Sequence, residues 1–165
     1  TSLNRRGLLM HLSDNFTQAE AERSMLAARR GIDNTAPAIV IPALQFVART
    51  VLEPARAQFG VPFSPSSWYR CLDLNRALGS SDRSQHIKGE AVDFEIPGVS
   101  NFELADWLRG AIEFDQLILE CYTPGKPASG WVHVSAFDEM NAGRPMRGEV
   151  LTYVPGTGYL KGLVA

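Results

Sequence analysis

Apolar residues recur in steps of three and four over the first half of the chain, a spacing that predicts amphipathic helices. Thr17-Gln-Ala-Glu20 is a capping-box pattern and predicts a helix over 18–29. A second, longer helix is expected from the turn at 33–37 to Gly60. Because proline cannot donate the hydrogen bond of a helix interior, Pro54 should kink or split it.

The second half of the chain changes to alternating apolar and polar residues, which is typical of half-buried strands. In the segment 90–96, Val92, Phe94 and Ile96 share an apolar face, and Asp93 lies on the other. A turn-rich loop over 123–130 predicts an antiparallel hairpin between its flanking strands. The remaining predicted elements are helices over 72–78 and 100–109 and strands over 114–122, 131–135 and 149–154.

This order of elements predicts an α+β fold in which N-terminal helices pack on a small antiparallel sheet. A chain of 165 residues is most simply one domain, 1–165, and is long enough to bury a sizeable core. We expect residues 1–16 to form an irregular N-terminal arm. Residues 138–165, rich in glycine and proline, should form a loop-rich tail with 149–154 as a last edge strand.

Composition excludes several classes of protein. Sixteen basic and eighteen acidic residues leave a net charge of −2, which argues against an extended nucleic-acid-binding surface. There is no run of 18 apolar residues, so we expect no membrane insertion. The segment 1–10 is too short and too soon interrupted for a secretion signal. We expect Cys71 and Cys121 to be reduced and packed, and the protein to be a monomer.

The stretch 84–93, SQHIKGEAVD, brings two candidate metal ligands together. His86 and Asp93 are seven residues apart and would point to opposite faces of one straight strand. Gly89 between them allows a turn, which would place His86 on the incoming loop and Asp93 on the strand. A catalytic zinc ion usually takes three protein ligands. His133 is the better candidate for the third, since His11 lies in the N-terminal arm.

A general base for such a site is expected from the neighbouring strand. If Glu120 lies opposite His133 in the predicted hairpin, the two share a face and the carboxylate comes close to the metal. Glu120 would then be the catalytic base that deprotonates the zinc-bound water. The alternatives are a surface glutamate of the hairpin, or a residue that orients one of the histidines.

Ser84-x-His86-x-x-Gly89-x-Ala91-x-Asp93, followed by Trp131-Val-His133, resembles the motif of the D-Ala-D-Ala carboxypeptidase group of zinc peptidases. That group belongs with lysostaphin-like and hedgehog-type metal-site proteins and includes bacteriophage endolysins. The resemblance extends to the segments 68–79, 114–120 and 150–160.

The resemblance implies one zinc ion held by His86, Asp93 and His133. It also implies a substrate-binding role for Arg70, whose alternative is an ordinary surface arginine, and a supporting or substrate-binding role for Ser84. There is one departure from the family pattern: several members place the catalytic carboxylate three residues before the last histidine, where this chain has Gly130.

The sequence therefore predicts a zinc peptidase that hydrolyses a stem or cross-link peptide of bacterial peptidoglycan. Its place of action would be the cell wall, as for an endolysin encoded by a phage or derived from one. The bond cleaved, by a carboxypeptidase or an endopeptidase, is left open. The alternative is a non-catalytic, zinc-stabilised module that binds the wall or has a structural role, because fold alone does not fix function.

Overall fold

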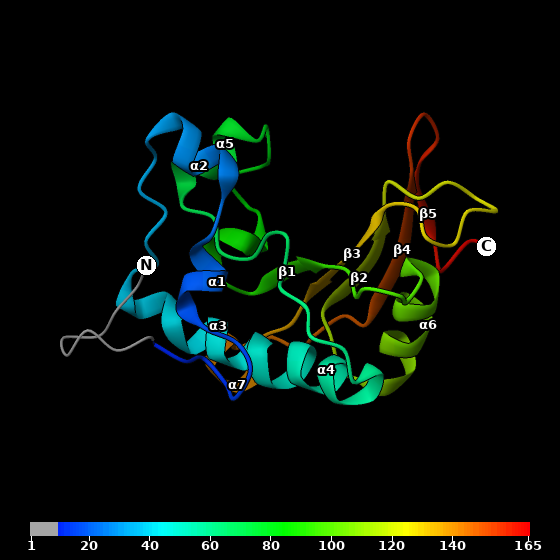
Figure 1. Ribbon diagram of the computed structural model, residues 1–165, viewed down its shortest axis with the longest axis horizontal. Helices are drawn as coiled ribbons and strands as arrows, with labels where there is room; N and C mark the ends of the chain where they lie inside the picture. The colour runs from blue at the N-terminus through cyan, green and yellow to red at the C-terminus, as the bar shows by residue number, and fades with distance from the viewer. Residues whose placement is uncertain (1–9) are drawn as a thin grey trace.

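The protein is built around a five-stranded mixed sheet (Figure 1). The computed structural model describes residues 10–165. The strands are β1 (Ala91–Phe94), β2 (Gln116–Glu120), β3 (Trp131–Ser135), β4 (Glu149–Val154) and β5 (Gly158–Lys161), in the order β1-β3-β2-β4-β5. The α-helices are α1 (Gln18–Glu22), α2 (Met25–Arg30), α3 (Ile41–Val47), α4 (Glu53–Phe59), α5 (Leu72–Ala77), α6 (Asn101–Ala111) and α7 (Glu139–Ala142). The predicted α+β class is confirmed.

The first predicted helix is two short helices, α1 and α2. Thr17 and Glu20 form the expected capping box at the start of α1. Arg23 then leaves the helical region, with ψ of 126°, and the Ser24 hydroxyl accepts from the backbone N–H of Ala27 to begin α2. The buried side chain of Asn34 donates to the carbonyl of Glu22 at 2.8 Å. This bond satisfies an orphan carbonyl at the end of α1, so the break costs little.

The long second helix is continuous but passes through a π-helical turn just before Pro54. It begins with a 3₁₀ turn, Ala38–Val40, and continues as α3, a π-helical turn at Ala48–Leu52, and α4. Pro54, which has no backbone N–H to donate, lies in the first turn of α4, two residues after the π-helical turn, so the helix is distorted at this point and not split. The segment Ala38–Phe59, 22 residues long, is long and apolar enough by composition to cross a membrane. The core helix of a globular protein passes the same test, and this segment packs its apolar face into the core.

The sheet is not purely antiparallel, because β4 runs parallel to β2. The β1–β3 and β2–β3 pairs are antiparallel, as predicted for the hairpin. β3 ends with Ser135 paired to Gln116, the first residue of β2. The chain then passes through α7 to the other side of β2, where Glu149 also pairs with Gln116. Because β4 starts at the end where β2 starts, the two strands are parallel.

The two ends of the described chain are more ordered than composition indicates. Residues 10–16 contain no helix or extended strand, but Leu12 and Phe16 are fully buried in the core. Positions 1–9 of the predicted arm lie outside the described residues. At the other end, the predicted edge strand is β4, which is internal, and β5 forms the edge of the sheet. Cys71 and Cys121 are both unpaired.

A buried carboxylate ties the C-terminal segment to the loop of the candidate site. Asp115, whose side chain is 1% exposed, accepts from Arg147 Nη2 at 2.7 Å and from Gln85 Nε2 at 3.1 Å. Burial would raise the pKa of Asp115, but the hydrogen bonds from Arg147 and Gln85 outweigh it and hold the pKa below its usual value. Asp115 thereby links Gln85, the neighbour of His86, to Arg147 in the C-terminal segment.

Candidate metal centre

His86 is placed by a short 3₁₀ turn, Gln85–Lys88, that leads into β1. The Ser84 hydroxyl accepts from the backbone N–H of His86 at 3.3 Å at the start of this turn. Gly89 ends the turn in the left-handed region with φ of 72°, as the sequence predicted. A Cβ at Gly89 would lie 2.7 Å from Val40, so glycine also allows the turn to pack on the long helix. Ser84 therefore supports His86, and it also lines the cleft.

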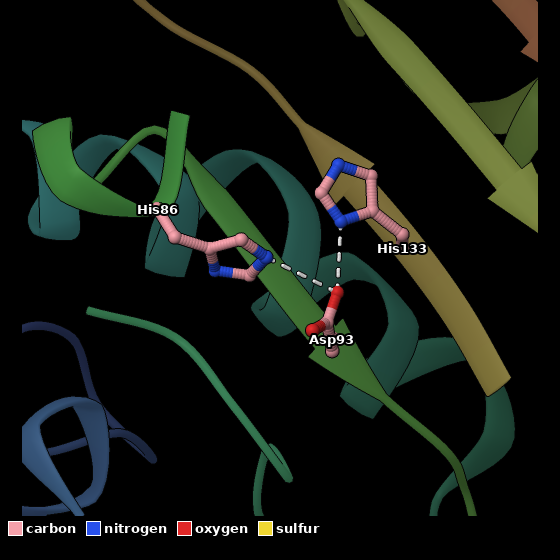
Figure 2. A group of neighbouring side chains, drawn as sticks. All are labelled: His86, Asp93 and His133. Carbon is pink, nitrogen blue, oxygen red and sulfur yellow. Dashed lines mark hydrogen bonds and ion pairs between the residues drawn. The ribbon is translucent and has the colours of Figure 1, made fainter. Parts of the chain in front are cut away.

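His86, Asp93 and His133 converge on one point (Figure 2). Asp93 on β1 and His133 on β3 are direct register partners. Asp93 Oδ1 lies 2.8 Å from His133 Nδ1 and 3.3 Å from His86 Nε2. One ligand atom from each of the three residues lies within 4.8 Å of the other two. The sequence identified these three residues correctly as a group able to bind a metal ion.

This donor set fits zinc. Two imidazole nitrogens and one carboxylate oxygen are ligands typical of a catalytic zinc ion, whereas calcium and magnesium prefer oxygen ligands alone. Ligand atoms bound tetrahedrally at about 2.0–2.1 Å lie about 3.3 Å apart. The separation between Asp93 Oδ1 and His86 Nε2 is 3.3 Å, so these two atoms already have the required spacing.

The surroundings of His86 and Asp93 favour a neutral imidazole and an ionised carboxylate, the protonation states that a metal ligand requires. Nδ1 of His86 lies 2.7 Å from the carbonyl oxygen of Trp68, so Nδ1 donates to it and Nε2 is left with a free lone pair. Burial lowers the pKa of His86, and the charge of Asp93 only partly opposes this. Burial would raise the pKa of Asp93, but its contacts with His86 and His133 outweigh burial and keep the pKa well below its usual value.

Arg70 holds the second oxygen of the same carboxylate. Its Nη2 donates to Asp93 Oδ2 at 2.8 Å, and its Nε donates to Ser67 Oγ at 2.9 Å. The side chains of Arg70 and Asp93 are 14% and 8% exposed. A guanidinium placed in this way fixes the orientation of the ligand carboxylate. Arg70 also lines the cleft, and its contact with substrate stays a prediction.

Glu120 lies on the expected face but not in the expected register. Ile118, not Glu120, pairs with His133, and Glu120 pairs with Trp131. Because side chains alternate along a strand, a shift of two residues keeps Glu120 on the face of His133. Its half-buried carboxylate has no hydrogen-bond or ion-pair partner within residues 10–165. Burial raises the pKa of Glu120; the charge of His133 lowers it and that of Asp93 raises it further.

Gly130, at the position where several members of the resembled group have a catalytic carboxylate, has no room for a side chain. The residue has φ of 70°, and a Cβ built on it would lie 1.9 Å from the backbone oxygen of Glu120. Cys121, beside it at the end of β2, also has a positive φ of 48°. The backbone at the mouth of the hairpin therefore leaves no room for a side chain at 130. Glu120, whose backbone oxygen Gly130 approaches, lines the cleft.

We expect Gly130→Ala to lower the free energy of unfolding by about 3 kcal/mol or more. About 1–2 kcal/mol comes from the left-handed backbone, and overpacking adds about 1–3 kcal/mol. Urea unfolding measures this difference. The matched control is Gly125→Ala in the same loop, where φ is 80° but no atom lies within 4 Å of the added Cβ. Equal losses in the two variants would contradict the close approach to Glu120.

The three candidate ligands lie in a cleft of about 520 Å³. Of the residues that line this cleft, the sequence analysis had singled out Arg70, Ser84, His86, Asp93, Glu120 and His133. It missed much of the rest of the cleft wall. The missed side chains include those of Ser80, Ser81, Arg83, Gln85, Gln116, Ile118 and Tyr159. Tyr159 is separated from the motif by more than sixty residues and gave no local signal. Arg83 directly precedes the motif serine, and its charge there was the one signal available.

The sequence matches the model of a known protein family. A family model described as peptidase M15 matches residues 14–135, which contain all three candidate ligands, Arg70 and Glu120. No match was found among curated proteins. The matched range ends at Ser135, so β4 and β5 lie outside it.

Proposed function

The chain belongs to the peptidase M15 family, and from this premise we propose that it is a zinc-dependent peptidase that hydrolyses peptide bonds of bacterial peptidoglycan. The main support is the meeting of His86, Asp93 and His133 at the cleft, with a free carboxylate, Glu120, on the same face of the sheet. The proposal includes action at the cell wall, as a D-Ala-D-Ala carboxypeptidase or an endolysin-type endopeptidase.

Each residue has a distinct part in the proposed reaction. His86 through Nε2, Asp93 through Oδ1 and His133 would hold one zinc ion. When bound, zinc acts as a Lewis acid that polarises a carbonyl group and lowers the pKa of water to about 7. Arg70 keeps the Asp93 carboxylate oriented through Oδ2.

Glu120 is the proposed general base. A carboxylate oxygen of Glu120 accepts a proton from the attacking water and later gives it to the nitrogen of the leaving amine. Two observations suit it for this role. Its carboxylate has no competing partner among the described residues, and burial raises its pKa toward the range in which a carboxylate accepts protons efficiently.

The test combines metal analysis with an assay on purified peptidoglycan. We expect the isolated protein to contain about one zinc ion per chain and to release free amino groups from peptidoglycan. Removal of the ion with a chelator should abolish the release, and added zinc should restore it. If the protein contains zinc but releases no amine from any of several peptidoglycans that differ in their stem or cross-link peptides, it would instead be the non-catalytic module.

A further inference from the structure

Of the three candidate ligands, His86 is the one that does not lie on a strand (Figure 2). Asp93 and His133 are direct partners in the pairing of β1 with β3, so the sheet itself fixes their separation. His86 lies on the 3₁₀ turn Gln85–Lys88, in the connection between α5 and β1. A connecting segment is usually more mobile than a paired strand. The geometry of the centre therefore depends on the contacts that hold this turn.

The turn is fastened to two distant segments. The backbone oxygen of His86 accepts from the N–H of Arg70 at 3.2 Å, and its Nδ1 donates to the carbonyl oxygen of Trp68 at 2.7 Å. The neighbouring side chain, Gln85, donates from Nε2 to Asp115 Oδ2 at 3.1 Å. Asp115 directly precedes β2. The second fastening therefore joins the turn to the start of a strand in the middle of the sheet.

Asp115 is held in turn by the C-terminal segment. Arg147 donates to it from Nη2 at 2.7 Å, from Nε at 3.0 Å and from the backbone N–H at 3.1 Å. The side chain of Asp115 is 1% exposed, and both of its oxygens accept from Arg147. Hydrogen bonds from a guanidinium to a carboxylate are stronger than neutral ones and restrict its orientation. Gln85 is therefore bonded to an acceptor that is itself fixed in place.

Another arginine–aspartate pair near the turn has the same short contact in a different setting. Arg76 Nη2 lies 2.7 Å from Asp82 Oδ2, and the two side chains are 56% and 54% exposed. Exposed ion pairs contribute little to stability, because water and salt screen them. Both partners belong to the stretch of chain just before His86, so this pair does not join the turn to another segment. Asp82 therefore provides a matched control for Asp115.

We propose that Asp115, held by Arg147, is a positioning residue that raises the metal affinity of the centre through Gln85. The inference rests on the proposed function for the identity of the ion, but it concerns binding and not hydrolysis. A turn that is already ordered loses less conformational entropy when its histidine binds the ion. Because Arg147 lies outside the range 14–135 that the family model matches, the proposal also gives the C-terminal segment a part in the centre.

Gln85→Ala is the decisive variant, because it removes the link and leaves the Asp115–Arg147 pair intact. We expect its zinc affinity, measured by competition with a zinc-binding dye, to be about tenfold lower, since changes in residues that orient ligands cost about 10–100-fold. In the metal-free protein the amide of Gly89, which donates to the carbonyl oxygen of His86 at 3.2 Å, should exchange its hydrogen faster. The midpoint of urea unfolding should stay close to that of the wild type.

Asp115→Leu removes the acceptor and should also lower the zinc affinity about tenfold. Because both changes break the same link, the double variant with Gln85→Ala should bind zinc no more weakly than the weaker of the two single variants. Asp82→Asn, the matched control, should bind zinc as the wild type does.

Three results would overturn the inference, whether or not the protein cleaves peptidoglycan. They are wild-type zinc affinity in Gln85→Ala, wild-type exchange of the Gly89 amide in the same variant, and losses of affinity that add in the double variant. Zinc affinity that depends on this link in a protein that cleaves nothing would support the inference and overturn the proposed hydrolysis.

Discussion

Replacement of His133 by alanine is expected to remove zinc from the centre and with it all hydrolysis. His133 lies on β3 between Asp93 and Ile118, and its side chain is 13% exposed at the floor of the cleft. Mutation of residues that only orient metal ligands costs about 10–100-fold in metal affinity, so loss of a ligand should cost more than about 100-fold. Competition with a zinc-binding dye measures the affinity, and amine release from peptidoglycan measures the activity.

The fold should survive this change, because the backbone pairs of β3 with β1 and β2 do not use the imidazole. His11→Ala is the matched control, since His11 is the remaining histidine of the chain and is exposed outside the cleft. We expect it to bind zinc as the wild type does. If His133→Ala retained wild-type zinc affinity, the ligand set His86, Asp93 and His133 would be wrong.

Glu120→Gln is expected to lower the rate of hydrolysis by about 10²–10⁴-fold, the usual contribution of a positioned general base or acid. Glutamine has nearly the same shape but cannot accept the proton at neutral pH. Zinc content should not change, because Glu120 is not in the group of three candidate ligands. Stability should stay equal or rise slightly, because burial disfavours the ionised form that glutamine removes.

The control for this experiment is Glu113→Gln, which neutralises an exposed glutamate just before β2 that does not line the cleft. It should hydrolyse peptidoglycan at the wild-type rate. Loss of zinc from Glu120→Gln would show that Glu120 orients a ligand instead. Wild-type turnover by Glu120→Gln would mean that another group is the base.

The two substitutions together separate catalysis from metal binding. His133→Ala should lose zinc and activity, whereas Glu120→Gln should lose only activity. For a non-catalytic module, the first substitution would lower stability through loss of the ion. The second would then have no measurable consequence on peptidoglycan, because the wild type would not cleave it either.

Short-range features of the fold could be predicted because they depend on neighbouring residues. The capping box at Thr17 and the turn at Gly89 are each formed within a few residues of chain. The π-helical distortion of the long helix before Pro54 has a similarly local cause. The division of 18–29 into two helices was missed, since Asn34, twelve residues beyond Glu22, satisfies the broken end.

The group His86, Asp93 and His133, which could hold a metal ion, could also be predicted from sequence, because the residue types and spacing of metal ligands are restricted by coordination chemistry. Glu120 was assigned to the correct face with the wrong partner. The face of a strand follows from the two-residue period of its side chains, but its register depends on which strands pack together. A register error of two residues leaves the face unchanged.

The sequence by itself therefore determined most of the helices and strands, their apolar faces and the group His86, Asp93 and His133 that could hold a metal ion. Only the tertiary structure decided that β4 runs parallel to β2, that Arg70 is bound to Asp93, and that Tyr159 joins the cleft. It also decided that Gly130 has no space for a side chain. The physical reason is common to all four: each depends on a contact between segments distant in the chain, and local periodicity contains no information about such contacts.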